Sequence, residues 1–129
     1  MIPRVGIGYD VHPFVDGRPL ALGDLGAHFP DSDPRWKGAH SLALLAQVAA
    51  MVHARGYVVG NVDATVLTEA PKLAPHVEAM RANLARALGV EVTQVSVKAT
   101  RPEGLGSLGK GEGLAVWAVA LLVPRGPAA

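Results

Sequence analysis

A carboxylate and an imidazole lie two residues apart near the start of the chain, in the segment Tyr9-Asp10-Val11-His12. Residues at alternate positions of an extended segment project to the same side, so we expect Asp10 and His12 to converge on one point. A carboxylate oxygen and an imidazole nitrogen are typical ligands of zinc and suit other divalent metals. The alternative interpretation is a surface aspartate that caps a turn beside an unrelated histidine, and this short motif does not decide between the two.

Two further regions could bind a polar or anionic ligand. The run from Ala70 to His76, APKLAPH, leads into a predicted helix, where exposed backbone amides and the charge of Lys72 would attract an anion. The segments 24–26 (DLG) and 29–34 (FPDSDP) are dense in turn-forming residues and offer amides and carboxylates to a sugar-like hydroxyl. Ordinary helix initiation explains the first region equally well, and an Asx-turn scaffold explains the second.

Two glycine-containing segments resemble nucleotide-binding motifs but fail on inspection. The loop 103–113 contains G-x-x-x-x-G-K, yet Gly111 follows Lys110 where a P-loop needs Ser or Thr, and the next predicted element is a strand. Gly6-Ile7-Gly8 does not complete G-x-G-x-x-G, because Val11 occupies the third glycine position. We therefore reject both a P-loop and a Rossmann site.

Local patterns predict the elements that position these residues. Short apolar or alternating segments predict strands at 5–9, 57–67, 95–99 and 114–123. Helical spacing predicts one helix from an N-cap at Ser41 to a stop at Gly56, and a second with Pro75 in its first turn and Gly89 as C-cap. The stripe of the second helix consists of Val77, Met80, Leu84, Ala87 and Leu88. The alternation predicts a single α+β domain over 1–129, a two-layer sandwich of a mixed β-sheet and helices. The last strand is apolar on both faces, so we expect it to be buried on both, within the chain or at a subunit interface.

Composition excludes several classes of protein. The chain has 129 residues, half of them hydrophobic, and a formal net charge of +1, so no strong field favours nucleic acid or an acidic membrane as partner. It has no cysteine, which excludes disulfides and thiolate metal sites and fits a reducing compartment. The longest apolar run, 114–123, is far shorter than the ~20 residues that span a bilayer, and the first residues do not resemble a signal peptide. A cytoplasmic protein is expected.

Taken in order, the motifs resemble one family. The segments VGIGYDVHPF, LGDLGAHFPDSDPRWKGAHS, GYVVGNVDATVLTEAPKLAPH, VKAT and EGLGSLGKGEG are similar to the 2-C-methyl-D-erythritol 2,4-cyclodiphosphate synthase family, nearly from Val5 to Val123. The resemblance implies a trimer-forming, metal-dependent cyclase with active sites between neighbouring subunits. It also implies the substrate, the cytidine diphosphate derivative 4-diphosphocytidyl-2-C-methyl-D-erythritol 2-phosphate, whose cyclisation releases CMP.

The resemblance further assigns roles to individual residues. Asp10 and His12 match two of three zinc ligands, and Glu103 matches a ligand of the Mg²⁺ or Mn²⁺ that bridges the substrate diphosphate. Thr100, Arg101 and Glu103 stand at positions of the family's catalytic region. The resemblance also implies a set of substrate-binding positions, which includes Asp10 and His12. The others are Asp24, Gly26, Phe29, Pro30, Asp31, Ser32, Asp33, Thr68, Ala70, Pro71, Lys72, Leu73, Ala74, Thr100, Glu103, Ser107 and Lys110.

The chain also departs from the family pattern. Between Leu20 and Leu22 the family carries roughly 30 further residues, about two strands and a helix, which include the third zinc-binding histidine and a loop histidine that assists the reaction. Either the segment is truly deleted, or the sequence omits a loop and is numbered across the gap. Arg101 and Pro102 replace two threonines, and Ser107 and Lys110 replace Phe and Arg. Two other functions therefore stay open: a catalytically silent trimeric nucleotide-binding relative without a complete metal site, and a generic metal-dependent phosphohydrolase.

Overall fold

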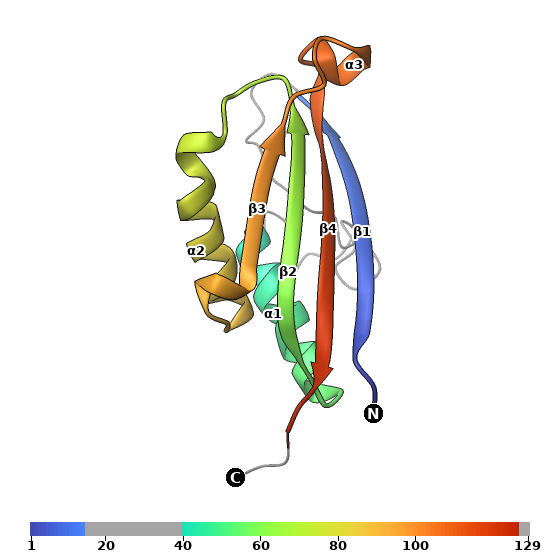
Figure 1. The fold of residues 1–129 in the computed structure, drawn as a ribbon, viewed down its shortest axis with the longest axis vertical. Coiled ribbons are helices and arrows are strands. Elements are labelled where there is room, and N and C mark those ends of the chain that lie inside the picture. Colours follow the sequence, from blue (N-terminus) through green and yellow to red (C-terminus); the bar gives the residue numbers. More distant parts are fainter. Residues whose placement is uncertain (15–39, 127–129) are drawn as a thin grey trace.

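The structure is a computed structural model that describes residues 1–14 and 40–126. These residues form one four-stranded sheet with two long helices (Figure 1). In chain order the elements are β1 (Arg4–Pro13), α1 (Ser41–Ala54), β2 (Tyr57–Thr68), the 3₁₀ turn η2 (Ala74–His76), α2 (Val77–Leu88), the 3₁₀ turn η3 (Val92–Gln94), β3 (Val95–Thr100), the short α3 (Gly106–Gly109) and β4 (Gly113–Pro124).

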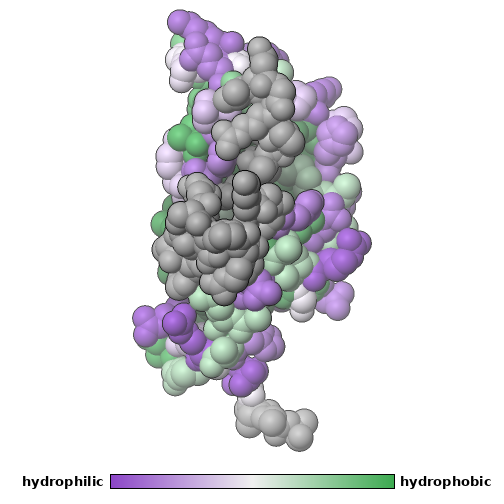
Figure 2. Space-filling model, turned by 180° about the vertical axis from the view of Figure 1, so that it is seen from behind, coloured by the Kyte–Doolittle hydropathy of each residue, from purple (hydrophilic) through white to green (hydrophobic). Residues whose placement is uncertain are grey.

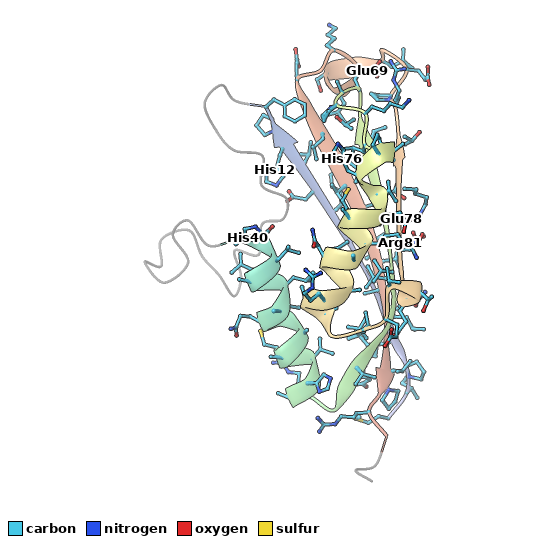
Figure 3. All side chains as sticks on the ribbon, turned by 90° about the vertical axis from the view of Figure 1, so that its left-hand side faces the viewer. His12, His40, Glu69, His76, Glu78 and Arg81 are labelled. Atoms are coloured by element: carbon cyan, nitrogen blue, oxygen red, sulfur yellow. The ribbon has the colours of Figure 1, made fainter. Side chains whose placement is uncertain are left out.

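The sheet is mixed, with strand order β1-β4-β2-β3. β2 and β3 are parallel, while β4 runs antiparallel to both β1 and β2. The last two strands in sequence are thus not neighbours, because β2 lies between them. α1 packs against β2 and α2, and α2 packs against β3, so both helices cover the same face of the sheet (Figures 1 and 3). The predicted two-layer α+β architecture is confirmed.

The core lies between the sheet and α2. Its buried members are Ala64 on β2, Val95 and Val97 on β3, and Ala85 on α2. The predicted apolar stripe of the second helix packs against them through Val77, Met80, Leu84 and Leu88. Because alternate residues of a strand project to the same side, the buried positions of β2 and β3 all face the helices. From the helix side, the described surface interleaves hydrophilic and hydrophobic residues (Figure 2).

The opposite side of β1 and β4 is apolar and exposed. The register pairs Val5 with Leu121, Ile7 with Val119 and Tyr9 with Trp117, so these side chains project together. We call this group, with Val11, the apolar face: Val5, Ile7, Tyr9, Val11, Trp117, Val119 and Leu121. Ile7 is 75% exposed, and even Leu121 on the interior strand β4 is 37% exposed. The expectation that the last strand is buried on both faces is therefore wrong for the single chain, because no described element packs over this side.

The ends of α2 agree with the sequence prediction, whereas the start of α1 differs from it. Gly89 caps α2 in the left-handed conformation with φ 71°, as predicted, and Pro75 lies in the 3₁₀ turn that precedes the helix. The N-cap of α1 is His40 rather than Ser41, because the Nδ1 atom of His40 accepts a hydrogen bond from the Leu42 amide at 3.3 Å. None of the described helices is long and apolar enough to cross a membrane.

Candidate functional site

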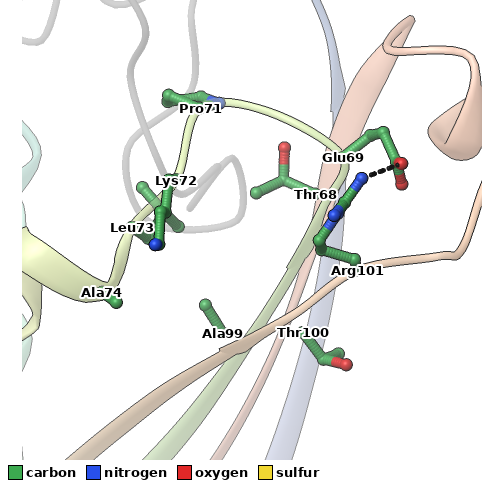
Figure 4. Close-up of a pocket in the computed structure, with 9 residues that line it drawn as sticks. All are labelled: Thr68, Glu69, Pro71, Lys72, Leu73, Ala74, Ala99, Thr100 and Arg101. Carbon is green, nitrogen blue, oxygen red and sulfur yellow. Dashed lines mark hydrogen bonds and ion pairs between the residues drawn. The ribbon is translucent and has the colours of Figure 1, made fainter.

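A cavity of about 340 Å³ opens where β2 and β3 end (Figure 4). Parallel pairing sets Leu67 opposite Thr100, so the carboxyl ends of the two strands meet at one edge of the sheet. From there β2 continues into the segment that starts α2, and this segment forms the far wall. The lining residues are Thr68, Glu69, Pro71, Lys72, Leu73, Ala74, Ala99, Thr100 and Arg101.

Thr68 shapes the wall on the β2 side. It is the one polar residue that is buried among those described, at 3% exposure. Its hydroxyl donates a hydrogen bond of 2.6 Å to the carbonyl oxygen of Ala70. Ala70 does not line the cavity itself, but this bond fixes the backbone from which Pro71 and Lys72 follow. Part of the cavity wall is therefore backbone whose position is fixed by the buried Thr68 side chain.

Charged side chains lie on two walls. The Nη2 atom of Arg101 donates to the Oε1 atom of Glu69 at 2.7 Å, and the Gly104 amide approaches the Oε2 atom at 3.5 Å. The hydrogen bond and the charge of Glu69 raise the pKa of the Arg101 guanidinium, which stays protonated at any physiological pH. Lys72 lies on the other wall (Figure 4). Two cations and one carboxylate leave the cavity with a net positive charge, which suits an anionic ligand.

Asp10 and His12 converge as expected. Both project from β1 toward the helix side, the side on which His40 begins α1 and His76 precedes α2 (Figure 3). The Nε2 atom of His12 lies 2.9 Å from the Oδ2 atom of Asp10, and both side chains are partly exposed. Within residues 1–14 and 40–126, no cluster of three His, Cys, Asp or Glu side chains is arranged to hold a metal ion. The pair therefore offers two ligands, and its role in binding metal stays a prediction.

The other predicted site residues lie outside the cavity or outside the described structure. Glu103 has a positive φ of 56° in the turn after β3, Ser107 lies in α3 and Lys110 follows it; none of the three lines the cavity. Asp24, Gly26, Phe29, Pro30, Asp31, Ser32 and Asp33 fall outside the described residues, as does the junction between Leu20 and Leu22.

Sequence reasoning missed two residues of the cavity, Glu69 and Ala99. Ala99 has no functional group and enters the cavity only because it precedes Thr100. Glu69 stands between Thr68 and Ala70, so the acid was visible in the sequence. Its importance depends on the pairing of β2 with β3, which brings it to Arg101 across 32 residues of sequence.

Comparison with known proteins identifies the family. A family model described as the YgbB family matches residues 20–123, a range that contains the whole cavity. The chain belongs to the YgbB family. A relative from Trichlorobacter lovleyi, named 2-C-methyl-D-erythritol 2,4-cyclodiphosphate synthase, is 44% identical over 95% of this chain and 99% of its own length. A protein of the same name from Stutzerimonas stutzeri is 49% identical over 93% of this chain and 98% of its own length.

Solved structures agree with this membership. The bifunctional IspDF from Campylobacter jejuni matches with a TM-score of 0.87 and 31% identity, covering 95% of this chain and 42% of that one. A 2C-methyl-D-erythritol-2,4-cyclodiphosphate synthase in its CDP-bound form matches with a TM-score of 0.80 and 27% identity, covering 92% of this chain and 99% of that one.

Proposed function

We propose that this YgbB protein is a 2-C-methyl-D-erythritol 2,4-cyclodiphosphate synthase of isoprenoid biosynthesis. It would convert 4-diphosphocytidyl-2-C-methyl-D-erythritol 2-phosphate to 2-C-methyl-D-erythritol 2,4-cyclodiphosphate with release of CMP. The observation that carries the proposal is similarity along the whole length of relatives with this name, at 44% and 49% identity. A positively charged cavity in the matched range supports it.

The reaction is an intramolecular phosphoryl transfer. An oxygen of the 2-phosphate attacks the β-phosphorus, the bond from that phosphorus to the oxygen of CMP breaks, and CMP leaves. Such a step asks the protein for positioning and for neutralisation of phosphate charge, with little covalent work. Backbone groups of the segment 70–74 would hold the cytosine, and Lys72, Thr100 and Arg101 would lie toward the phosphates. Asp24, Gly26 and 29–33 would contact the erythritol part.

A divalent metal belongs to the proposal. Asp10 and His12 fit zinc by their chemistry, because they offer a carboxylate oxygen and an imidazole nitrogen from one face of β1. These two atoms are hydrogen-bonded to each other at 2.9 Å, and a bound ion would replace that hydrogen bond. Glu103 would hold Mg²⁺ or Mn²⁺ at the substrate diphosphate. When bound, such an ion supplies positive charge to the phosphate oxygens. Catalytic zinc usually has three protein ligands, and the described residues supply two of them.

A homotrimer with sites between subunits is the proposed assembly. The apolar face supports it, since a row of exposed valine, isoleucine and aromatic side chains on one side of a sheet is typical of a surface that another chain covers. Tyr9 and Trp117 lie within this face with their ring centroids 4.9 Å apart, which gives it an aromatic centre. A cytoplasmic location remains a prediction, and the cysteine-free composition supports it.

The test is release of CMP from the diphosphocytidyl substrate in the presence of Zn²⁺ and Mg²⁺. His12→Gln should lower the rate by at least about 10²-fold, the loss typical when one electrostatic stabiliser is removed from an active site. His53→Gln is the matched control, because His53 is exposed near the end of α1 and away from the cavity. A protein that binds CDP but releases no CMP would instead be the silent nucleotide-binding relative. Phosphate release from unrelated phosphoesters would favour the generic phosphohydrolase.

A further inference from the structure

Arg101 lies toward the phosphates in the proposed function, but that proposal gives no role to its ion pair with Glu69 at the edge of the cavity. We propose that Arg101 binds the terminal phosphate of the ligand and that Glu69 is a positioning residue that holds the guanidinium for it. The inference deepens the proposed function and rests on it for the identity of the ligand. It makes Arg101 the residue that distinguishes a nucleoside diphosphate from a monophosphate.

The placement of the two residues follows from the parallel strands. Leu67 pairs with Thr100, so residues just past the two strand ends face each other. Arg101 and Ala99 line the same wall, and Arg101 reaches across to Glu69 (Figure 4). The pair thus joins the ends of β2 and β3 at the point where the cavity opens.

The exposure of the two side chains is unequal, and this favours a binding role. The Glu69 side chain is 20% exposed, whereas that of Arg101 is 65% exposed. Both Glu69 oxygens have donors, one from Arg101 and one from the Gly104 amide. The acid is therefore held in the wall, while the guanidinium extends from it toward solvent. Exposed ion pairs add little to folding stability, so stability alone gives no reason for this arrangement.

The guanidinium keeps most of its hydrogen-bonding capacity. It has five N–H donors in a planar fork, and among the described residues only Nη2 has an acceptor. The second N–H of Nη2, together with the neighbouring N–H of either Nε or Nη1, can then donate to two oxygens of a phosphate, the bidentate mode for which arginine is suited. Glu69 would hold the side chain in one orientation before the ligand arrives, which lowers the entropy lost on binding.

Geometry also indicates which phosphate Arg101 would contact. The segment 70–74, proposed to hold cytosine, contributes residues 71–74 to one wall, and Arg101 follows the end of β3 on the other (Figure 4). A nucleotide bound along this direction places its base toward the first wall and the far end of its phosphate chain toward Arg101. Removal of Arg101 should therefore weaken binding of CDP more than binding of CMP. If Arg101 had a purely structural role, its removal would weaken binding of both nucleotides equally.

The experiment is isothermal titration of CMP, CDP and inorganic pyrophosphate into the full chain and its variants. Arg101→Gln should lower the affinity for CDP by about tenfold, the effect of losing one charge-assisted contact, and the affinity for CMP by less than about threefold. Arg101→Lys keeps the charge without the fork and should recover part of the loss. Glu69→Ala should weaken CDP by about threefold, because a mobile Arg101 must be ordered on binding.

Arg125→Gln is the charge-matched control. Arg125 is exposed and its amide bonds the Gly56 carbonyl, at the end of β2 opposite to the cavity. It should leave both affinities unchanged, and thermal melting should show every variant folded. An unchanged ratio of CDP to CMP affinity in Arg101→Gln would overturn the inference, and wild-type CDP affinity in Glu69→Ala would overturn the role of Glu69. If the wild type binds neither nucleotide, the proposed function fails, and pyrophosphate binding still decides whether Arg101 binds phosphate.

Discussion

Gly113 allows the strand that carries Asp10 and His12 to lie close to β4. It pairs with Pro13 at the end of the β1–β4 ladder. A Cβ atom at this position would overlap the carbonyl oxygen of His12 and lie 3.1 Å from both the His12 carbonyl carbon and the Pro13 Cα. These are backbone atoms, so no side chain can rotate away. In Gly113→Ala the end of β1 must move from β4 by about 1 Å, the shift needed to restore an ordinary van der Waals contact.

The expected effect on activity is larger than the effect on stability. Overpacking of this kind costs about 1–3 kcal/mol. For a chain of this length that corresponds to a fall in melting temperature of roughly 4–12 °C. A displacement of about 1 Å at a catalytic group can cost about 10²-fold in rate. Because His12 is the displaced residue, we expect CMP release to fall by 10–100-fold while the protein stays folded at 25 °C.

Melting by circular dichroism and CMP release should be measured on the same samples, with Gly6→Ala as control. Gly6 lies in the same strand, and no described atom lies within 4 Å of the Cβ position. This variant should retain most activity. If Gly113→Ala melts with the wild type and releases CMP at the wild-type rate, the close approach of the strands does not position His12 and the reasoning is refuted.

Three further predictions concern other parts of the structure. Arg81→Ala should lower the free energy of unfolding in urea by about 2 kcal/mol, because Arg81 donates to the carbonyl of the buried Val95 at 2.7 Å; a change below about 0.5 kcal/mol would contradict this. Thr68→Val should cost about 1 kcal/mol and weaken CDP in titrations, because the carbonyl of Ala70 loses its donor; equal CDP affinity would count against a backbone binding wall. Ile7→Asp should dissociate the proposed trimer in sedimentation experiments, and an intact trimer would show that the apolar face is not the interface.

Elements defined by neighbouring residues were predicted well. β2 and α2 were placed within one or two residues, since alternation, Pro75 and Gly89 are all local signals. β1 was expected to end at Tyr9 but extends to Pro13. Its extra residues are held by pairing with β4, a hundred or more positions later in the sequence, and no local pattern reports such a partner.

One wall of the candidate site was predictable from Lys72 and the helix start at 70–76, and the rest only where the family resemblance pointed to it. That resemblance indicated 70–74, Thr100 and Arg101, and the structure brings most of them round one cavity. It did not indicate Glu69, whose contact with Arg101 depends on the register of two parallel strands. The two apolar faces of β4 raised a similar difficulty, because hydrophobicity predicts burial without saying whether the same chain or another one provides the cover.

The two sides of β1 have a thermodynamic consequence. One side contributes four residues to the apolar face, and the other carries Asp10 and His12, so a single strand serves both surfaces. A ligand that fixes the conformation of β1 on one side therefore also fixes the side chains that β1 presents on the other. By linkage, a cation bound at Asp10 and His12 would strengthen association of subunits by the same factor by which association strengthens binding of the cation. The apparent affinity for metal would then depend on protein concentration, and dilution and chelation would displace the same equilibrium.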